Sequence, residues 1–326
     1  MFAEPMRRTV PRTLLTVVAV VACLGGVRCG GGNSATGPTP PNNPPGDPSP
    51  PGPTPPPATT FTFVGAGDIA VCDALDPARQ TGQLVQSIGG TVFTLGDNAY
   101  FSGTAKEYRE CYDPAWGRAK SFTRPVAGNH EYDGGSAGVP YFDYFGGNAF
   151  SGGPGPGAGY YSFDFGTPPV WHVIALNSNL ATSDSSAQGV WLRNDLAANR
   201  TKCTLAYWHH PLFTSAQNGP QTFTRPFWVQ LYNAGAEIVL GGHDHTYESF
   251  APQDPDGRPD PARGIREFVV GTGGAPLYQF VTQARNSLRQ VRAFGVLKLT
   301  LSAETYEWQF LQVGGGVGDS GFGQCH

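Results

Sequence analysis

The sequence has few charged residues for its length and no excess of basic ones. Only 14% of the 326 residues are Asp, Glu, Lys or Arg, and the formal net charge is −4. A charged fraction this low argues against a coiled coil and against wholesale disorder, while the 39% of hydrophobic residues is enough for a sizeable core. The acidic balance argues against nucleic-acid binding by a basic surface. We therefore expect a folded domain with no sequence-specific binding of nucleic acid.

The apolar run near the N-terminus is too short for a stable membrane span. It covers residues 14–22 and follows three arginines, a pattern typical of a signal peptide over residues 1–22. The run ends in Val-Val-Ala followed by Cys23, which resembles the bacterial lipobox, whose cysteine is diacylated. We expect an exported protein that is lipid-anchored to the bacterial cell envelope only through Cys23. Secretion or periplasmic release after cleavage nearby is the alternative.

Proline is concentrated in one segment. Twelve of the 30 prolines lie between Pro38 and Pro57. Proline removes backbone donors and fixes its own φ angle, so this segment cannot form a helix or a central strand. Residues 23–59 are therefore predicted to be a Pro-rich tether between the signal peptide and the folded domain.

From residue 60 onward, short apolar runs alternate with helical patterns, and the last three runs have no helix between them. This order predicts an α/β (α+β) fold in which two mixed β-sheets pack together with helices outside. The catalytic domain is expected over residues 60–313, followed by a Gly-rich tail over 314–326. The expected strands are 61–64, 91–95, 124–127, 160–165, 170–176, 203–208, 237–240, 268–270, 294–301 and 305–313, and the expected helices are 77–88, 104–112, 187–199 and 226–234.

Five of these expected strands are each followed at once by a polar cluster with metal-type ligands, and four of the five segments contain glycine. Five of the seven histidines fall in three of the clusters. Glycine allows the sharp turns that aim side chains into the crevice at the strand ends. Carboxylates, an amide, a phenol and imidazoles, with no thiolate, suit Fe, Mn or Zn, which predicts a dinuclear metal centre. The segments are FVGAGD68IA, FTLGD97NAY100, PVAGN129H130E, AYWH209H210P and IVLGGH243DH245.

These five segments, in this order, resemble those of the calcineurin-like metallophosphoesterases, and the Gly-Asp-x-x-Tyr form of the second resembles the purple acid phosphatase branch. The resemblance covers nearly all of residues 61–312 and implies a four-layer sandwich holding two metal ions, Fe(III) and a divalent Zn, Mn or Fe. By motif match, the first site has Asp68, Asp97, Tyr100 and His245, and the second has Asp97, Asn129, His209 and His243. One departure is Asp68-Ile69-Ala70 where the purple branch usually has Asp-x-Gly.

Two further histidines are expected to act on substrate. His130 follows the expected ligand Asn129 and would point at the phosphoryl group, where it could stabilise charge or protonate the leaving oxygen. His210 could assist the leaving group, or it could only pack beside His209. The remaining histidines, His172 and His326, are expected to be structural.

Four cysteines remain once Cys23 and Cys29 are set aside, and four cysteines permit three pairings. Cys72 follows the first expected metal loop and Cys111 ends the helix after the second, so their pairing would join two ligand loops. The remaining pair would then fix the tail, through Cys325, to the strand that delivers His209 through Cys203. In an exported protein we expect both bridges to form.

The leading functional hypothesis is an exported phosphomonoesterase that acts on small phosphate esters. A phosphodiesterase or nucleotidase of the same fold is the alternative, because the same metal pair serves both and selectivity would lie in loops 132–160 and 212–225. Loop 132–160 is rich in aromatic residues, which fits a nucleobase platform or a packed lid. The third hypothesis is a non-catalytic surface lipoprotein.

Overall fold

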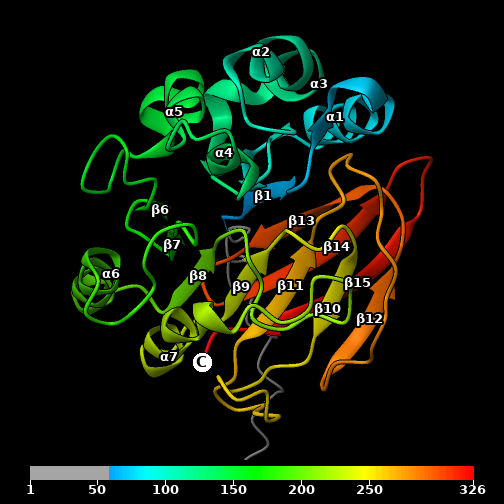
Figure 1. The fold of residues 1–326 in the computed structure, drawn as a ribbon. Coiled ribbons are helices and arrows are strands. Elements are labelled where there is room, and N and C mark those ends of the chain that lie inside the picture. The colour runs from blue at the N-terminus through cyan, green and yellow to red at the C-terminus, as the bar shows by residue number, and fades with distance from the viewer. Residues whose placement is uncertain (1–58) are drawn as a thin grey trace, which may run out of the picture. The chain divides into compact units, whose positions relative to one another are not determined.

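The computed structural model describes residues 59–326, in which two β-sheets lie face to face (Figure 1). The first sheet has six strands in the order β15-β14-β13-β1-β3-β5. Its first three strands in sequence run parallel and the last three are antiparallel. Their bounds are β1 Phe61–Ala66, β3 Thr91–Leu95, β5 Thr123–Val126, β13 Gly295–Leu301, β14 Thr305–Gln312 and β15 Val317–Gln324.

The second sheet has seven strands in the order β12-β10-β11-β9-β8-β7-β6. Strands β7, β8, β9 and β11 are parallel to one another, and the outer strands are antiparallel. A two-stranded ribbon, β2 Ala70–Val71 with β4 Ala99–Tyr100, lies apart from both sheets. The seven strands are β6 Tyr161–Phe165, β7 Trp171–Ala175, β8 Cys203–Tyr207, β9 Ile238–Gly241, β10 Tyr247–Phe250, β11 Arg266–Val270 and β12 Ser287–Val291.

Helices cover the outer side of each sheet, which completes the expected four layers (Figure 1). Those that pack on the first sheet come from the N-terminal half, and α6 and α7 pack on the second sheet. The helices are α1 Asp76–Ile88, α2 Ala105–Glu107, α3 Asp113–Trp116, α4 His130–Asp133, α5 Val139–Phe145, α6 Ala187–Ala198 and α7 Arg225–Asn233, with a π-helix at Tyr108–Tyr112 and 3-10 turns at Cys72–Ala74, Gly117–Phe122, Gly146–Ala149 and Thr222–Thr224.

Aromatic rings fill the space between the two sheets. Phe63 of β1 lies 4.7 Å from Phe93 of β3, and 5.7 Å from both Phe165 and Tyr207 of the second sheet, measured between ring centroids. Phe63, Phe93 and Tyr207 are fully buried. Buried aromatic pairs contribute packing energy beyond their area. This core holds the sheets so that the carboxyl ends of their parallel strands lie near one another.

The expected fold class is confirmed, and every expected strand has a counterpart close to its predicted bounds. The expected helix over 104–112 is divided instead into α2, the π-helix and α3, and it continues to Trp116. Strands β10 and β12 and helices α4 and α5 were not expected. The local sequence pattern therefore located the core strands better than the outer elements.

The C-terminal segment 314–326 is the clearest correction. It was expected to be a tail beyond the domain, but residues Val317–Gln324 form β15, which pairs with Thr305–Leu311 of β14. A Cβ at Gly321 would lie 2.2 Å from the Trp308 ring, and one at Gly323 would lie 2.2 Å from the Tyr306 ring. The glycines therefore make room for two large rings of the neighbouring strand.

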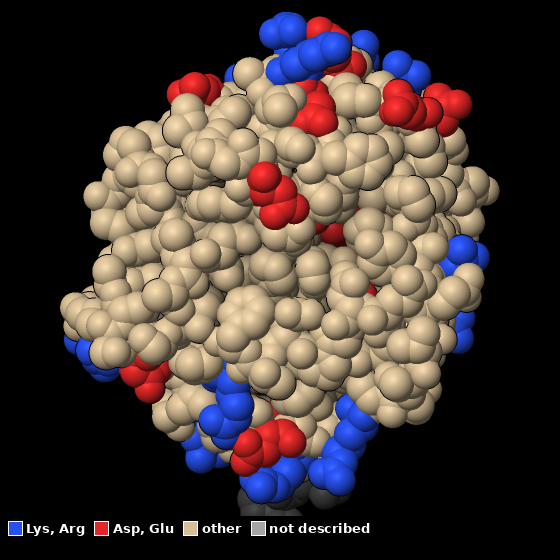
Figure 2. All heavy atoms as spheres, in the orientation of Figure 1, with Lys and Arg blue, Asp and Glu red and all other residues tan. Residues whose placement is uncertain are grey.

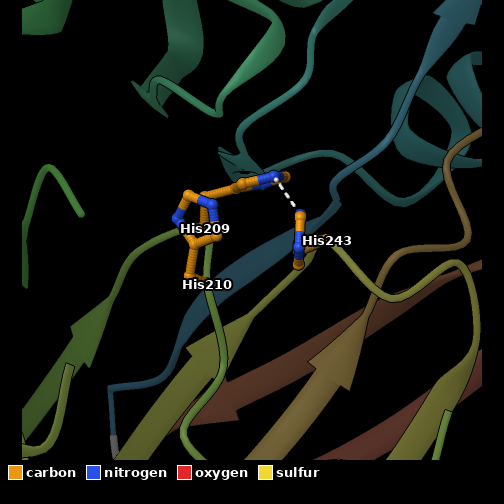
Figure 3. A group of neighbouring side chains, drawn as sticks. All are labelled: His209, His210 and His243. Carbon is orange, nitrogen blue, oxygen red and sulfur yellow. Dashed lines mark hydrogen bonds between the residues drawn. The ribbon is translucent and has the colours of Figure 1, made fainter. Parts of the chain in front are cut away.

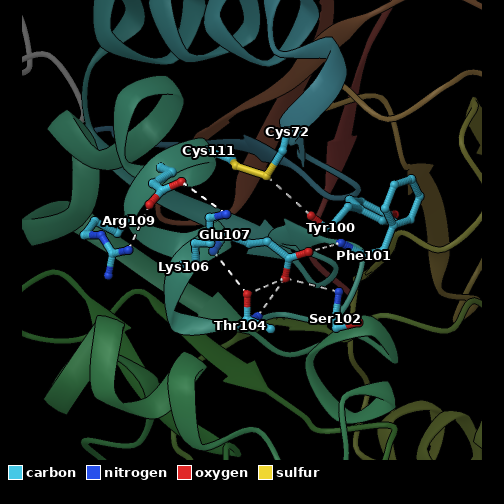
Figure 4. The surroundings of a disulfide bond; sticks show 10 residues. Cys72, Tyr100, Phe101, Ser102, Thr104, Lys106, Glu107, Arg109 and Cys111 are labelled. Carbon is cyan, nitrogen blue, oxygen red and sulfur yellow. Dashed lines mark hydrogen bonds and ion pairs between the residues drawn. A yellow bond between two sulfur atoms is a disulfide. The ribbon is translucent and has the colours of Figure 1, made fainter.

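Both expected disulfides are present, Cys72–Cys111 and Cys203–Cys325. The first lies beside the second metal-type segment, with Sγ of Cys72 3.7 Å from the carbonyl oxygen of Tyr100 (Figure 4). The second joins the residue after β15 to the start of β8. The C-terminus is thus covalently tied to the strand that precedes His209.

Replacing Cys325 with serine should lower the free energy of unfolding by about 3–5 kcal/mol, because the bridge closes a loop of 122 residues. Chemical denaturation of the oxidised wild type and the variant measures the difference. A loss below about 1 kcal/mol would show that β15 is held by its pairing with β14 alone.

The expected signal peptide (1–22), the lipidation site Cys23 and the Pro-rich tether up to residue 58 lie outside the described residues. Among residues 59–326, no helix has the length and apolar character needed to cross a membrane.

Candidate metal centre

The metal-type residues lie where the parallel strands of both sheets end. In the first sheet, Asp68 follows β1, Asp97 follows β3, and Asn129 and His130 follow β5. In the second sheet, His209 and His210 follow β8, and His243 follows β9, with His245 just before β10. Backbone contacts join the two sets, since the N–H of His243 donates to Oδ2 of Asp68 at 2.9 Å. All nine expected site residues are therefore in one region of the molecule.

Three of these residues have positive φ angles, which non-glycine residues rarely adopt. The φ angles are 60° at Asp68, 49° at Asp97 and 67° at His243. Such conformations cost on the order of 1–3 kcal/mol each and concentrate at functional sites. Gly128 shows how closely the loops approach, because a Cβ there would lie 2.1 Å from Oδ1 of Asp97. The turns aim these side chains inward at the expense of backbone stability.

The first half of the cluster is centred on the hydroxyl of Tyr100. This hydroxyl donates to Oδ1 of Asp68 at 3.0 Å or to Oδ2 of Asp97 at 3.2 Å, and it lies 3.1 Å from Nε2 of His245. Burial, followed by the charges of the two carboxylates, raises the pKa of Tyr100 well above its usual value. Metal binding would have to displace this phenol proton.

The second half is centred on Nε2 of His209. This nitrogen lies 3.1 Å from Oδ1 of Asn129, 3.2 Å from Nδ1 of His243 and 3.3 Å from Oδ2 of Asp97. Figure 3 shows His209 and His243 turned toward each other, with His210 beside them. His209 and the two aspartates are buried. Asp97 belongs to both halves of the cluster.

The donor atoms fit a pair of cations. Nδ1 of His209 lies 2.7 Å from the carbonyl oxygen of Leu95, and Nδ1 of His245 lies 2.8 Å from that of Pro276. These contacts place the ring proton on Nδ1 and leave the Nε2 lone pair facing the cluster, the arrangement that metal-binding histidines usually have. In neutral His209, that lone pair faces the acceptor atoms of Asn129 and Asp97 with no proton between them. A bound cation would satisfy all of them.

The buried charges of the cluster shift the pKa values of its members. Burial opposes charge on His209, but the Asp97 carboxylate outweighs this effect and raises the pKa of His209 to about 9. Burial would likewise raise the pKa of Asp97, but His209 and then His130 hold it below its usual value. The ion pairs of Asp68 and Asp97 within the described residues are all with histidines. The site therefore has no built-in lysine or arginine to neutralise its carboxylates.

His130 lies at the rim of the cluster, at the start of α4, with its side chain 26% exposed. Its Nδ1 lies 2.6 Å from the carbonyl oxygen of Phe101, and its ring is 4.5 Å from that of Tyr100. The Nδ1 contact directs Nε2 toward the site. Nε2 of His130 therefore lies 3.8 Å from Oδ2 of Asp97, at the edge of the cluster.

His210 is more enclosed than His130. Its Nδ1 lies 2.8 Å from Oγ of Ser178, and its ring is 4.5 Å from that of His243. Burial, together with His209 and His243, lowers the pKa of His210 to about 2, so its ring is neutral. A neutral imidazole can accept or donate a hydrogen bond but cannot supply charge. This environment is compatible with either of the two expected roles.

Sequence reasoning assigned no role to Glu131, which is fully buried beneath the site. Its carboxylate accepts the backbone N–H groups of Asp97 at 3.0 Å, Asn98 at 2.9 Å and Gly128 at 2.6 Å, and the Tyr108 hydroxyl at 3.0 Å. Burial and the nearby charge of Asp97 raise the pKa of Glu131 to about 7. The only signal in the sequence is its place directly after Asn129 and His130.

Asp244 was also missed, although it stands between two expected ligands. It is buried, and it accepts the Thr214 hydroxyl at 2.7 Å and the Asn218 N–H at 3.0 Å. The Asn218 side chain in turn donates to the carbonyl oxygen of His243 at 2.9 Å. These contacts attach loop 212–218 to the turn that carries His243 and His245.

Several known proteins are similar to this chain in sequence. Tartrate-resistant acid phosphatase type 5 of Oryctolagus cuniculus is 27% identical over 210 residues, which cover 55% of this chain and 62% of that protein. Purple acid phosphatase 15 of Arabidopsis thaliana is 33% identical over 95 residues, covering 27% of this chain and 17% of that protein. The chain therefore spans less than two thirds of the length of the curated relatives named here.

A purple acid phosphatase from seeds of yellow lupin (Lupinus luteus) has a similar solved structure, with a TM-score of 0.69 at 21% identity, covering 81% of this chain and 54% of that one. At this level of identity the likeness concerns the fold. The family model for calcineurin-like phosphoesterases matches residues 61–247, more than half of the chain and all five metal-type segments. The chain belongs to the calcineurin-like phosphoesterase family.

Proposed function

We propose that this protein is a metal-dependent phosphomonoesterase with a dinuclear centre. The main support for this proposal is that oxygen and nitrogen lone pairs converge around Asp97 from strained turns. Within the described residues, neither Asp68 nor Asp97 forms an ion pair with lysine or arginine. The acid phosphatase relatives support a phosphate-ester substrate.

The ligands divide as the two halves of the cluster do. Asp68, Asp97, Tyr100 and His245 would hold one ion, and Asp97, Asn129, His209 and His243 would hold the other. A phenolate oxygen beside carboxylates suits Fe(III), and an amide oxygen with two imidazoles suits Zn, Mn or Fe in the divalent state. Such a pair of ions would neutralise phosphoryl oxygens and make water a stronger acid at neutral pH.

The chain itself would position the substrate and move its protons. Nδ1 of His130 faces the Phe101 carbonyl oxygen at 2.6 Å, so in the protonated ring Nε2 would carry the second proton and could donate it to a phosphoryl oxygen or to the departing oxygen. His210 is neutral and is hydrogen-bonded to the Ser178 hydroxyl. It would hydrogen-bond the substrate or keep the His243 ring in place. The buried carboxylate of Glu131 would keep the two loops that carry Asp97 and Asn129 at a fixed separation.

The direct test is an assay of purified, metal-loaded protein with phosphomonoesters, phosphate bis-esters and nucleotides, alongside metal analysis. Release of inorganic phosphate from monoesters in excess over cleavage of bis-esters is expected. Preferential cleavage of bis-esters would favour the phosphodiesterase alternative. A chain that binds no metal and hydrolyses nothing would be a non-catalytic surface protein.

Tyr100→Phe tests the expected iron ligand. A phenolate bound to Fe(III) gives a visible charge-transfer band, so the iron-loaded wild type should be coloured and the variant should lose the band while retaining some metal. Absorption spectroscopy and metal analysis measure both. Tyr278→Phe is the matched control. The Tyr278 ring stacks on that of His245 with 4.0 Å between centroids, but Tyr278 is not among the proposed ligands, so the Tyr278→Phe variant should keep the charge-transfer band. An iron-containing, active wild type without a band that depends on Tyr100 would remove this residue from the coordination sphere.

We further propose, from the sequence alone, that the protein is exported and lipid-anchored through Cys23. The arginines, the apolar run and the Val-Val-Ala-Cys sequence support this proposal. Mass spectrometry of the mature N-terminus in a bacterial host should find diacylated Cys23. An unmodified N-terminus beyond Cys29 would overturn it.

A further inference from the structure

Two exposed phenyl rings, Phe101 and Phe223, lie beside the proposed metal centre. They are 60% and 44% exposed. The aromatic residues of loop 132–160 were predicted to form either a nucleobase platform or a packed lid. Their rings pack inward and do not form an exposed platform. Tyr141 and Phe145 are buried there, and Phe142 packs against the core. Among the exposed phenylalanines of residues 59–326, Phe101 and Phe223 are the ones whose rings lie beside site histidines.

Phe101 is an exposed ring on a firmly held backbone. Its ring centroid lies 5.8 Å from that of Tyr100 and 6.4 Å from that of His130. The Glu107 carboxylate accepts the backbone N–H groups of Phe101, Ser102 and Thr104 (Figure 4). The Phe101 ring therefore lies beside His130, the proposed proton donor, and hydrogen bonds to Glu107 hold the backbone of its loop in place.

Phe223 approaches the cluster from a different segment, the 3-10 turn before α7. Its ring centroid lies 5.3 Å from that of His210, which is itself 4.5 Å from that of His243. The backbone carbonyl of Phe223 accepts the Thr182 hydroxyl at 2.5 Å, which ties the turn to the loop before α6. The two rings therefore contact the two histidines expected to face the substrate, His130 and His210.

The charges nearest the two rings are an exposed carboxylate and a paired arginine. Asp133 has a side chain 56% exposed, with Oδ2 3.7 Å from Nδ1 of His130, the histidine beside Phe101. Arg225, two residues after Phe223, pairs with Asp256. On the face drawn in Figure 2, Lys and Arg gather along the margins and most of the middle is uncharged. A second anionic group on a substrate would therefore meet the Asp133 carboxylate beside Phe101 and no unpaired charge from Arg225 beside Phe223.

We propose that the leaving group of the preferred substrate is a neutral alcohol with an aromatic ring, which packs on Phe101 and Phe223. This inference rests on the proposed phosphomonoesterase function and specifies its substrate class. Water attacks phosphorus, the bond from phosphorus to the leaving oxygen breaks, and the products are inorganic phosphate and the aromatic alcohol. Apolar packing by the two rings would bind the part of the substrate that the phosphoryl site does not touch.

The test compares benzyl phosphate with ethyl phosphate, whose leaving alcohols have similar basicity but differ in the ring. We expect kcat/KM of the wild type to favour benzyl phosphate about tenfold or more. Phe101→Ala and Phe223→Ala should each reduce this ratio at least about threefold. Phe122→Ala, which removes another exposed ring that is 63% exposed and contacts none of the site histidines, should leave it unchanged. A ratio near one in the wild type, or one retained in both site variants, would overturn the inference.

Failure of the proposed function has a different signature. If neither ester is hydrolysed, the binding of benzylphosphonate and ethylphosphonate to metal-loaded protein, measured by calorimetry, still decides the aromatic preference. Tighter binding of benzylphosphonate that depends on Phe101 and Phe223 supports the inference, and equal binding contradicts it.

A substrate with a second negative charge, 3-phosphoglycerate, should be hydrolysed more slowly than glycerol 3-phosphate.

Discussion

Asp97→Asn should lower kcat by at least about a thousandfold and release at least one metal ion per chain. The carboxylate is buried and contacts both halves of the cluster, through Tyr100 and through His209. Asparagine keeps the shape but loses the negative charge and one acceptor oxygen. Losing a group that contacts both ions would weaken the pair on which catalysis depends.

Activity assays and metal analysis of the same preparations measure this effect. Asp76→Asn is the control, since the Asp76 side chain is 86% exposed at the start of α1, and it should leave both properties unchanged. Circular dichroism shows whether the Asp97 variant keeps its fold. A folded Asp97→Asn variant with full activity would overturn the dinuclear account.

Glu131→Gln should both destabilise the fold and weaken metal binding, although Glu131 is not among the proposed ligands. Its two oxygens accept three backbone N–H groups and one hydroxyl. A glutamine would turn an NH2 group toward these donors and leave buried N–H groups without acceptors, at about 1–3 kcal/mol for each. We expect the free energy of unfolding to fall by about 3 kcal/mol or more and metal affinity to fall about 10- to 100-fold.

Denaturation and metal titration separate these two effects. Glu110→Gln is the matched control, because Glu110 is about half exposed and pairs only with surface residues, so its effect should stay within about 0.5 kcal/mol. Metal affinity equal to that of the wild type in a folded Glu131→Gln variant would show that Glu131 does not position the ligand loops.

The strands that carry the site could be predicted because their sequences are simple. β1, β3, β8 and β9 are short apolar runs followed by a ligand, with glycine before the ligand after β1, β3 and β9, and apolar runs of this kind are typical of buried parallel strands. The site followed from the same pattern, because carboxyl ends of parallel strands share an edge. All nine expected residues lie together for this reason.

The parts that could not be predicted depend on contacts between distant residues. Glu248 makes β10 look polar, yet it is buried and accepts the Ser215 N–H at 2.8 Å. Gly321 and Gly323 make β15 look like a flexible tail, yet they lie on the Trp308 and Tyr306 rings. Glu131 looks like a surface residue at a helix start until the loops that it joins are seen. A local pattern contains no information about such partners.

Anomalous diffraction from crystals of the purified, active protein would locate the metal ions of the proposed centre. Two peaks are expected within bonding distance of the Asp97 carboxylate, one beside Tyr100 and His245 and the other beside Asn129, His209 and His243. An active protein with a single peak, or with no peak at Asp97, would rule out a pair of ions that share Asp97.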